Sequence, residues 1–225
     1  MTGVVIPTYN EAENIPALFE GLAPLDAQII VVDDGSKDGT PELAEKAGAR
    51  VIRRGRKMGL ASAYVHGMTE ALSLGLDPIV QMDADLSHQP SDVARLLPAL
   101  EEADLVLGSR WVEGGGIENW DATRLWLSRF GSRYSRLLLD LPYRDLTGGF
   151  KAWRAPLLAR IDLQSIRSEG YAFQVETTFR AHRRGARIRE VPIIFADRFA
   201  GQSKMSWNIA LEAAFVVPML RWRGQ

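Results

Sequence analysis

Two aspartates, Asp83 and Asp85, stand one residue apart directly after an apolar run at residues 78–82. This pattern is typical of a buried strand that delivers two carboxylates to the C-terminal edge of its sheet, where open α/β sheets bind ligands. Carboxylates this close repel each other unless a cation lies beside them. The cation that carboxylates share with substrate phosphates is a hard one, Mg²⁺ or Mn²⁺. The alternative is a solvated turn with an aspartate cap, and the triplet alone leaves both interpretations open.

The composition is that of an ordinary globular chain. Of its 225 residues, 46% are hydrophobic and 24% are charged. Cysteine is absent, which excludes disulfides and thiolate chemistry. The first ten residues lack the pattern of a signal peptide, and no apolar run approaches the roughly 20 residues of a membrane-spanning helix. We therefore expect a cytoplasmic protein.

Charge is divided unequally between the two halves of the chain. Up to Val106 there are 8 Lys and Arg against 17 Asp and Glu, whereas from Leu107 onward there are 19 against 11. An acidic half is suited to holding a metal, and a basic half to holding phosphate or an anionic membrane surface. The plainer interpretation is that many of the arginines only solvate helix faces.

Strand and helix patterns alternate along the first half of the chain. Strands are expected at 4–6, 28–32, 50–53, 78–82 and 104–108, and helices at about 11–21, 60–74 and 91–100. Asn10 and Glu13 resemble a capping box for the first helix, and Thr40 resembles an N-cap before Pro41. The predicted fold class is α/β, a mostly parallel sheet with helices on both faces.

Polar residues follow three of these strands. They are Tyr9 and Glu11, then Asp33 and Asp34, then the Asp83–Asp85 pair. If the strands are parallel neighbours, all three sets meet at one rim. No G-x-G-x-x-G follows the first strand and no Walker A sequence occurs, so dinucleotide and P-loop sites are excluded in favour of a nucleotide-sugar pocket.

A series of motifs resembles, in order, those of the polyprenol-phosphate (dolichol-phosphate) mannose synthases, which are family 2 inverting glycosyltransferases with a GT-A fold. The motifs are PTYNEAENI, VVDDGSKDGT, GLASAYVHG, QMDADLSHQP, GSRWVEGGG, DLTGGFKAW, GYAFQVE and RFAGQSKMS. The resemblance extends through about Trp207. It implies a GT-A (Rossmann-like) catalytic domain at 1–204, and residues 205–225 are predicted to form a C-terminal amphipathic helix.

The resemblance implies transfer of mannose from GDP-mannose to polyprenyl phosphate, with inversion and with Mg²⁺ or Mn²⁺. It also assigns roles by position. Guanosine contacts would come from Pro7, Tyr9, Glu11, Val32 and Asp34; metal-diphosphate contacts from Asp83, Ala84 and Asp85; and phosphate contacts from Arg110, Arg198 and Lys204. Ser87 stands where some relatives have a metal-ligating Gln, so it is a third candidate ligand.

The expected nucleophile is itself an anion. A phosphate monoester has a second pKa near ~6 and is largely ionised at neutral pH, so it requires cations and donors rather than a general base. The chain lacks the Glu-Asp base motif of sugar-acceptor relatives and reads Asp145-Leu-Thr-Gly-Gly in that place. Arg110, with Arg124 and Ser128 at i, i+4 of one helix, is the predicted acceptor-phosphate site. The alternative is a solvated arginine and an ordinary helix serine.

Two amphipathic segments suggest membrane contact. The helix predicted at about 122–141 has apolar residues near one stripe with arginines beyond it, which fits either a core-facing helix or an interfacial one. Residues 206–223 are too broken to span a bilayer but end in Arg221-Trp222-Arg223. We expect peripheral contact with the cytoplasmic face of a membrane, with a membrane-anchoring partner subunit as a further option, and no nucleic acid. Arg198 and Lys204 flank a glycine-containing segment that would close over bound nucleotide.

Other interpretations remain open. A UDP-hexose (glucose) transferase acting on undecaprenyl phosphate is the nearest, although such relatives usually continue into spanning helices. A non-catalytic subunit with the same fold is less consistent with an intact Asp83–Asp85 pair. A nucleotidylyltransferase would need a glycine-rich basic loop after the first strand, where this chain reads PTYNE. Glu176 is predicted to lie on a helix, either facing the pocket or buried in an ion pair, and His88 near the metal loop shows no metal-ligand spacing.

Overall fold

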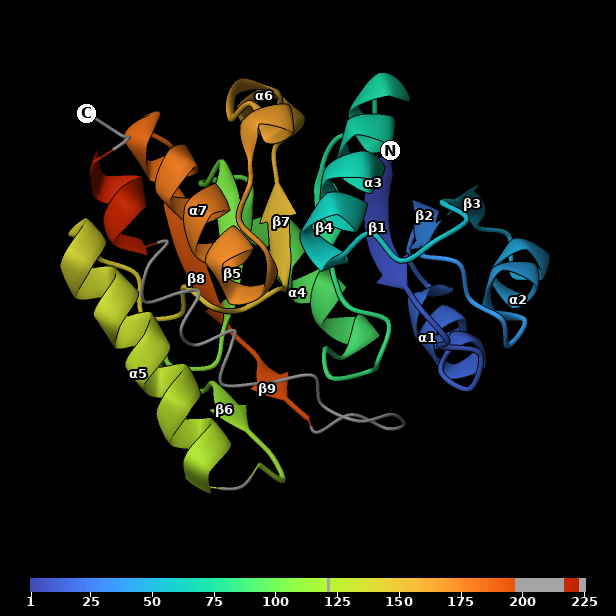
Figure 1. Ribbon diagram of the computed structural model, residues 1–225, viewed down its shortest axis with the longest axis horizontal. Helices are drawn as coiled ribbons and strands as arrows, with labels where there is room; N and C mark the ends of the chain where they lie inside the picture. Colours follow the sequence, from blue (N-terminus) through green and yellow to red (C-terminus); the bar gives the residue numbers. More distant parts are fainter. Residues whose placement is uncertain (121, 197–216, 223–225) are drawn as a thin grey trace.

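A seven-stranded sheet forms the centre of the molecule in the computed structural model, which describes residues 1–120, 122–196 and 217–222. The strand order is β3-β2-β1-β4-β7-β5-β8 (Figure 1). Its strands are β1 (Thr2–Thr8), β2 (Ala27–Asp33), β3 (Arg50–Arg53), β4 (Ile79–Gln81), β5 (Leu105–Ser109), β7 (Lys151–Trp153) and β8 (Ile188–Pro192). All neighbours are parallel except at β7, which is antiparallel to both β4 and β5. The predicted mostly parallel α/β sheet is confirmed.

Helices cover both faces of the sheet, because strand residues alternate between two apolar clusters. The helices are α1 (Ile15–Leu22), α2 (Thr40–Lys46), α3 (Leu60–Ser73), α4 (Val93–Ala99), α5 (Ala122–Leu139), α6 (Ala155–Arg160) and α7 (Gly170–Arg183), with short 3-10 turns at Pro90–Asp92 and Leu163–Ser165. On one face α3, α6 and α7 pack against Val5, Val32 and Trp153. On the other, α1, α2 and α4 pack against neighbouring strand residues such as Val4 and Val31.

The order of the strands reverses between β1 and β4. From β1 the chain proceeds to β2 and β3 on one side, whereas β4 lies on its other side, in register with Val5 opposite Gln81. In open α/β sheets a crevice forms outside the carboxyl ends of strands at such a reversal. The fold therefore opens a binding site at the point where residues 7–11 leave β1 and residues 83–88 leave β4.

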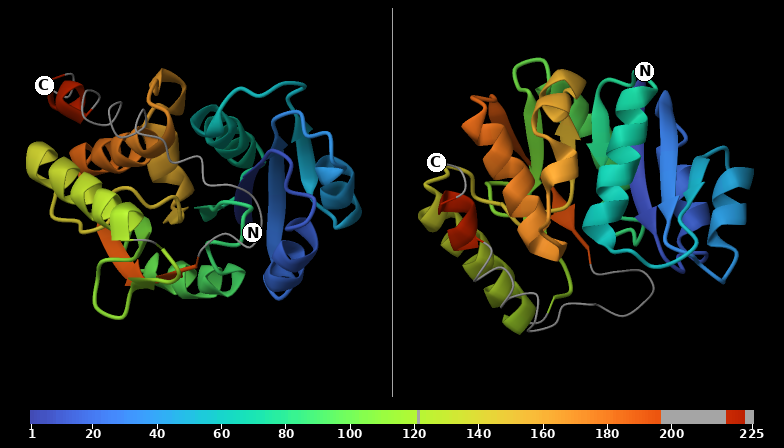
Figure 2. Two further views of the ribbon diagram at one scale, coloured as in Figure 1. Left: turned by 60° about the horizontal axis from the view of Figure 1, so that its bottom comes forward. Right: turned by 45° about the horizontal axis from the view of Figure 1, so that its top comes forward.

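The helix α5 lies along one side of the molecule, outside the two helix layers (Figure 2). Its C-terminal end meets α7 and the helical residues 217–222 in a small apolar cluster that includes Leu139, Phe179 and Val217. A short two-stranded parallel sheet, β6 (Gly116–Ile117) with β9 (Ile194–Phe195), joins the segments before α5 and after β8. None of the helices described here is long and apolar enough to cross a membrane.

The predicted capping box at the first helix is wrong. Asn10 adopts a left-handed conformation, and its side chain accepts a hydrogen bond from the backbone of Lys37 while its own N–H donates to Ser36 Oγ. The first helix begins only at Ile15. Asn10 thus ties two loops together, which a local helix-start pattern does not reveal. Thr40 is the first residue of α2 rather than its cap, which is Gly39.

Candidate active site

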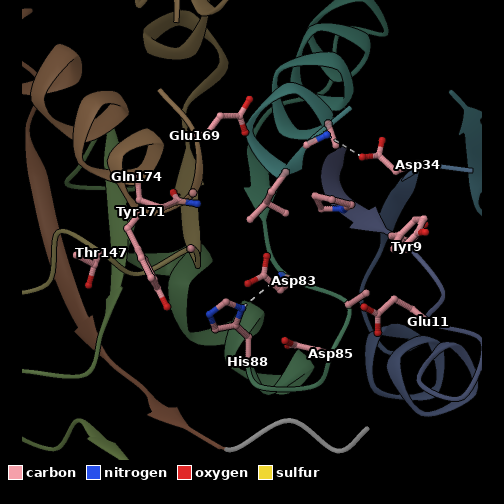
Figure 3. A pocket seen from close by; sticks show the side chains of 18 of the residues that line it. Tyr9, Glu11, Asp34, Asp83, Asp85, His88, Thr147, Glu169, Tyr171 and Gln174 are labelled. Carbon is pink, nitrogen blue, oxygen red and sulfur yellow. Dashed lines mark hydrogen bonds between the residues drawn. The ribbon is translucent and has the colours of Figure 1, made fainter. Parts of the chain in front are cut away.

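A cavity of about 380 Å³ opens at the carboxyl ends of β1 and β4. It is lined by Pro7, Thr8, Tyr9, Glu11, Asp34, Lys57, Gly59, Leu60, Ala63, Asp83, Ala84, Asp85, His88, Arg110, Trp120, Thr147, Gly149, Glu169, Gly170, Tyr171, Gln174 and Phe195. Figure 3 shows its arrangement: Asp83 and His88 lie between a wall with Tyr9 and Asp34 and an opposite wall with Gln174. The fold therefore brings members of all three predicted polar sets to one cavity: Tyr9 and Glu11 after β1, Asp34 after β2, and Asp83 and Asp85 after β4.

Asp85 and Asp83 are each held by a hydroxyl. Ser87 donates to Asp85 Oδ1 twice, from its backbone N–H at 3.1 Å and from Oγ at 2.5 Å. Tyr64, fully buried on α3, donates its hydroxyl to Asp83 Oδ1 at 2.6 Å. Burial, together with this carboxylate, raises the pKa of Tyr64 well above its usual value, so the phenol stays a donor.

The two carboxylates fit a divalent cation that is shared with a bound diphosphate. Among the described residues no cluster of three or more His, Cys, Asp or Glu side chains that could hold a metal ion is present. Hard cations such as Mg²⁺ are held in this way, by one or two carboxylates plus substrate phosphates. Ser87 is fully buried, donates to Asp85 and does not line the cavity. Its geometry favours orienting Asp85 over direct ligation.

One end of the cavity is suited to a planar base and ribose. The Lys57 ammonium lies 4.4 Å from the centre of the Tyr9 ring. Asp34 Oδ2 accepts the backbone N–H groups of Met58 and Gly59, both at 3.0 Å, and thereby fixes the loop that carries Lys57. Pro7, Glu11 and Ala84 also line the cavity, whereas Val32 is buried in the core and does not line it; the expected nucleotide contacts of these residues stay predictions.

Arg110 lies in the cavity wall, where the carboxylate of Asp145 balances its charge. Its Nε and Nη2 donate to the two oxygens of Asp145, both at 2.7 Å, and Nη2 also donates to Thr147 Oγ1 at 2.9 Å. Burial opposes both charges, yet the pair raises the pKa of Arg110 and lowers that of Asp145. Within the described part of the chain Nη1 makes no hydrogen bond. Asp145 is thus bound on both oxygens and is not placed to act as a base.

Of the predicted acceptor residues on α5, Ser128 lies on the buried face of the helix. Ser132 Oγ is 3.1 Å from Thr147 Oγ1, the same hydroxyl that Arg110 contacts. Ser128, one turn earlier, is buried, and its Oγ has no hydrogen-bond partner among the described residues. Ser128 does not line the cavity itself. The side chain of Arg124, and the whole of Arg198 and Lys204, lie outside the described residues, so their roles stay predictions.

His88 is buried between Phe150 and Phe195, whose ring centres lie 5.0 and 5.2 Å away. Its Nδ1 accepts the backbone N–H of Asp83 at 3.4 Å, which leaves the proton of a neutral ring on Nε2. Burial lowers the pKa of His88, which favours that neutral form. His88 therefore accepts a hydrogen bond from the Asp83 backbone and borders the cavity. Its spacing from the other histidines in the sequence is not that of a set of metal ligands.

Several residues that line the cavity were not predicted from the sequence. Thr147 and Gly149 belong to the quoted DLTGGF motif, and Tyr171 and Gln174 to GYAFQVE, but neither motif indicated which residue faces the site. The i, i+3 spacing of Tyr171 and Gln174 on α7 was the available signal. Glu176, which the sequence left open, is buried in an ion pair with Arg180 at 2.5 Å and does not line this cavity.

With this geometry in place, comparison with known proteins decides the family. The family model described as "Glycosyl transferase family 2" matches residues 3–161. This chain belongs to glycosyl transferase family 2. The match spans β1 to α6 and so includes both aspartates and the Arg110–Asp145 pair.

Two relatives that match over nearly the whole chain confirm the resemblance to polyprenol-phosphate mannose synthases that the motifs indicated. The chain is 47% identical to undecaprenyl-phosphate mannosyltransferase of Micrococcus luteus, over 97% of this chain and 92% of the relative. It is 43% identical to polyprenol monophosphomannose synthase of Mycolicibacterium smegmatis, over 100% of this chain and 88% of the relative.

The fold also matches solved structures. The crystal structure of glucosyl-3-phosphoglycerate synthase from Mycobacterium tuberculosis with Mn²⁺, UDP and phosphoglyceric acid superimposes with a TM-score of 0.73 at 21% identity, covering 100% of this chain and 78% of that one. The same enzyme with Mn²⁺, UDP-glucose and phosphoglyceric acid gives a TM-score of 0.67 at 22% identity, covering 100% and 79%. At this identity the likeness shows the GT-A fold alone, as predicted.

Proposed function

We propose that the chain transfers mannose from GDP-mannose to a polyprenyl phosphate, with inversion at the sugar carbon, giving polyprenyl-phosphate mannose and GDP. The observation that carries the proposal is the pairing, in one cavity, of the Asp83–Asp85 carboxylates with an arginine whose neighbouring carboxylate is fully occupied. The names of the two full-length relatives, a mannosyltransferase and a monophosphomannose synthase acting on polyprenyl phosphates, support the same reaction.

The occupied state of Asp145 supports an acceptor that needs no base. A sugar hydroxyl must lose a proton as it attacks, and a carboxylate commonly takes it. Asp145, which the motif resemblance sets in the place of the base motif of sugar-acceptor relatives, is buried and bound to Arg110 through both oxygens. A phosphate monoester brings its own negative charge. Arg110 and Thr147, which both line the cavity, would then attract and orient the nucleophile rather than activate it.

The leaving group needs charge stabilisation at the opposite side of the sugar. Asp83 and Asp85 would hold Mg²⁺ or Mn²⁺, which supplies Lewis-acid stabilisation of the departing diphosphate. The Mn²⁺ in the crystal structures of the synthase with the same fold supports a divalent ion. Ser87 and Tyr64 keep the two carboxylates in fixed orientations. The base would lie beside Tyr9 and Lys57, in the pocket that Asp34 supports.

Membrane attachment is proposed through the outward face of α5. Trp126, Phe130 and Leu137 are 64%, 51% and 68% exposed, and the Trp126 and Phe130 rings stack at 5.2 Å. Exposed arginines, Arg129, Arg133 and Arg136, flank this apolar stripe. Aromatic groups with flanking arginines match the interface of an anionic bilayer. A lipid acceptor would thereby be met at the membrane surface; that this is the cytoplasmic face stays a prediction, as does a membrane-anchoring partner subunit.

A donor and acceptor assay tests the proposal. The protein is incubated with divalent metal, with GDP-mannose or UDP-glucose, and with polyprenyl phosphate or the free polyprenol. We expect a mannosylated lipid only from GDP-mannose with the phosphorylated lipid. The alternative, UDP-hexose transfer, predicts turnover with UDP-glucose alone. Transfer to the free polyprenol at a similar rate would refute a phosphate nucleophile.

A further inference from the structure

A chain of buried amides leads from the centre of the sheet to the cavity. Trp153 on β7 donates its indole N–H to Gln81 Oε1 at 3.2 Å, and Gln81 Nε2 donates to Gln174 Oε1 at 2.9 Å. Trp153 and Gln81 are fully buried, and Gln174 is 3% exposed. Of the three, only Gln174 lines the cavity.

The direction of this chain is fixed by its first member. An indole N–H can only donate, so Gln81 must turn its oxygen toward Trp153 and its nitrogen toward Gln174. Gln174 must then present its oxygen to Gln81. Its NH₂ group is left facing the cavity beside Gly149.

The backbone of Gln174 is held as firmly as its side chain. The Lys151 ammonium, buried under α7, donates to the carbonyl oxygen of Gln174 at 2.7 Å and to Thr177 Oγ1 at 3.0 Å. A preorganised donor of this kind is what a recognition site requires, because little ordering cost remains on binding.

The atoms around Gly149 show which group lies opposite the Gln174 amide. A Cβ at Gly149 would lie 3.4 Å from Gln174 Nε2 and 3.5 Å from Asp83 Oδ2, so the donor and the carboxylate border the same small space. In Figure 3 Gln174 points across the cavity toward Asp83. An ionised phosphate oxygen could accept from the amide but has no hydrogen to donate to the carboxylate. A sugar hydroxyl can accept from the amide and donate to the carboxylate at once.

We propose that Gln174 recognises a hydroxyl of the transferred hexose, and that Gln81 and Trp153 are positioning residues that keep its nitrogen turned toward the sugar. The inference rests on the proposed function, because it takes the cavity to hold a sugar nucleotide. It adds the residue that distinguishes a nucleotide carrying its sugar from the free nucleotide.

The test compares the Kd for GDP-mannose with the Kd for GDP, in the presence of metal, by titration calorimetry. Gln174→Met keeps the length and volume of the side chain but has no donor. We expect it to weaken GDP-mannose binding about 10-fold, the scale of one lost hydrogen bond with an unpaired partner, and to leave GDP binding unchanged. Unchanged GDP binding also shows that the variant is folded.

Two further variants separate recognition from structure. Gln174→Glu keeps an acceptor for Gln81 but offers the cavity an oxygen, and we expect at least the same loss of preference for the sugar nucleotide. Gln81→Met leaves Gln174 in place with its amide free to rotate, and we expect a smaller loss in the same direction. Equal weakening of GDP and GDP-mannose by Gln174→Met, or no weakening of either, would overturn the proposal.

The same titrations keep this proposal distinct from the proposed function. UDP-glucose and UDP are run in parallel with the wild type. A wild type that accepts only UDP-glucose overturns the mannose donor, and the Gln174 proposal is then judged on the ratio for that pair. A wild type that binds neither sugar nucleotide overturns both.

Discussion

The Arg110–Asp145 pair carries the site's chemistry at the scale of single residues. Both side chains are almost completely buried, at 2% and 0% exposure, and meet through two parallel hydrogen bonds. While both members are present their opposite charges cancel, so the pair adds no net charge to the buried site. It keeps a cation in the cavity wall while withdrawing the nearby carboxylate from base chemistry.

Asp145→Asn should therefore destabilise the protein strongly. The substitution leaves the Arg110 charge buried and unpaired, and breaking a buried pair costs about 3–5 kcal/mol. Urea denaturation of the wild type and the variant measures the difference. Glu102→Gln, at the exposed Arg189–Glu102 pair, is the matched control and should leave the free energy of unfolding nearly unchanged. An Asp145→Asn variant as stable as the control would contradict this account of the pair.

Lys151 should give the protein a distinct pH dependence. Burial lowers the pKa of Lys151 to about 7, against a smaller opposing effect of Asp145. The unfolded lysine titrates near ~10.4, so between those pH values the unfolded state binds more protons and the free energy of unfolding rises with pH. Below the pKa that Lys151 has in the folded protein, the lysine is protonated in both the folded and the unfolded state. Its contribution to the free energy of unfolding then no longer changes with pH.

The comparison with Lys151→Met isolates this effect, because other groups titrate alike in both proteins. The wild-type free energy of unfolding minus that of the variant should rise between pH 7 and 10, by at most about 1.4 kcal/mol per pH unit. Denaturation curves at several pH values give the difference. A flat difference across that range would show that Lys151 titrates normally.

The sequence predicted which residues lie near the cavity better than it predicted which groups those residues contact. Asp83, Asp85 and Arg110 line the cavity as predicted, because a strand end determines where its next residues lie. Ser87 and Val32 were placed in the site by resemblance, yet Ser87 turns its hydroxyl to Asp85 and Val32 lies in the core. The spacing of Gln174 from Tyr171 was a signal that it could face the site, but the orientation of its amide depends on Trp153 and Gln81, which are distant in sequence.

At the scale of elements, α5 has an unusual distribution of side chains. Its inward face carries Ser128, Ser132 and Ser135, all buried, while large aromatic groups face outward. The sequence stripe that included Phe130 predicted either a core-facing or an interfacial helix; Phe130 is 51% exposed, which excludes the core-facing role for that residue. Of these hydroxyls, that of Ser132 contacts Thr147, which in turn accepts a hydrogen bond from Arg110.

Removing the outward aromatics should impair membrane binding. The double substitution Trp126→Ser with Phe130→Ser is expected to lower partitioning into anionic vesicles by roughly 10-fold or more, because both rings are lost from the interface. Vesicle co-sedimentation measures this. Leu74→Ser, at a residue 43% exposed beyond the end of α3, is the control and should bind as the wild type does. Equal binding by both variants would remove α5 from the membrane contact.

Element boundaries were predicted where apolar periodicity is clear. Arg50–Arg53 was predicted to the residue, and the helix expected at 60–74 is α3. The strand β7 was not predicted, because its three residues include the buried Lys151 and give no period-two pattern. Its antiparallel pairing with β4 and β5 depends on long-range contacts.

At the scale of the whole molecule, the cavity joins the two halves of the chain. The acidic first half supplies Asp83 and Asp85 from β4, and the basic second half supplies Arg110 from the end of β5 and the wall formed by α7. The charge asymmetry predicted this division. Leaving group and nucleophile are both anionic, so separating their binding groups across the sugar lets one cavity hold both.

The central claim is that a divalent cation beside Asp85 allows the diphosphate to leave. The most direct measurement is single-turnover formation of lipid-linked mannose by the wild type and Asp85→Asn, with metal, with a chelator, and with metal restored. We predict that chelation stops transfer in the wild type, that metal restores it, and that Asp85→Asn is slower by about 100-fold or more. Undiminished transfer in the chelator, or a wild-type rate in Asp85→Asn, would contradict the claim.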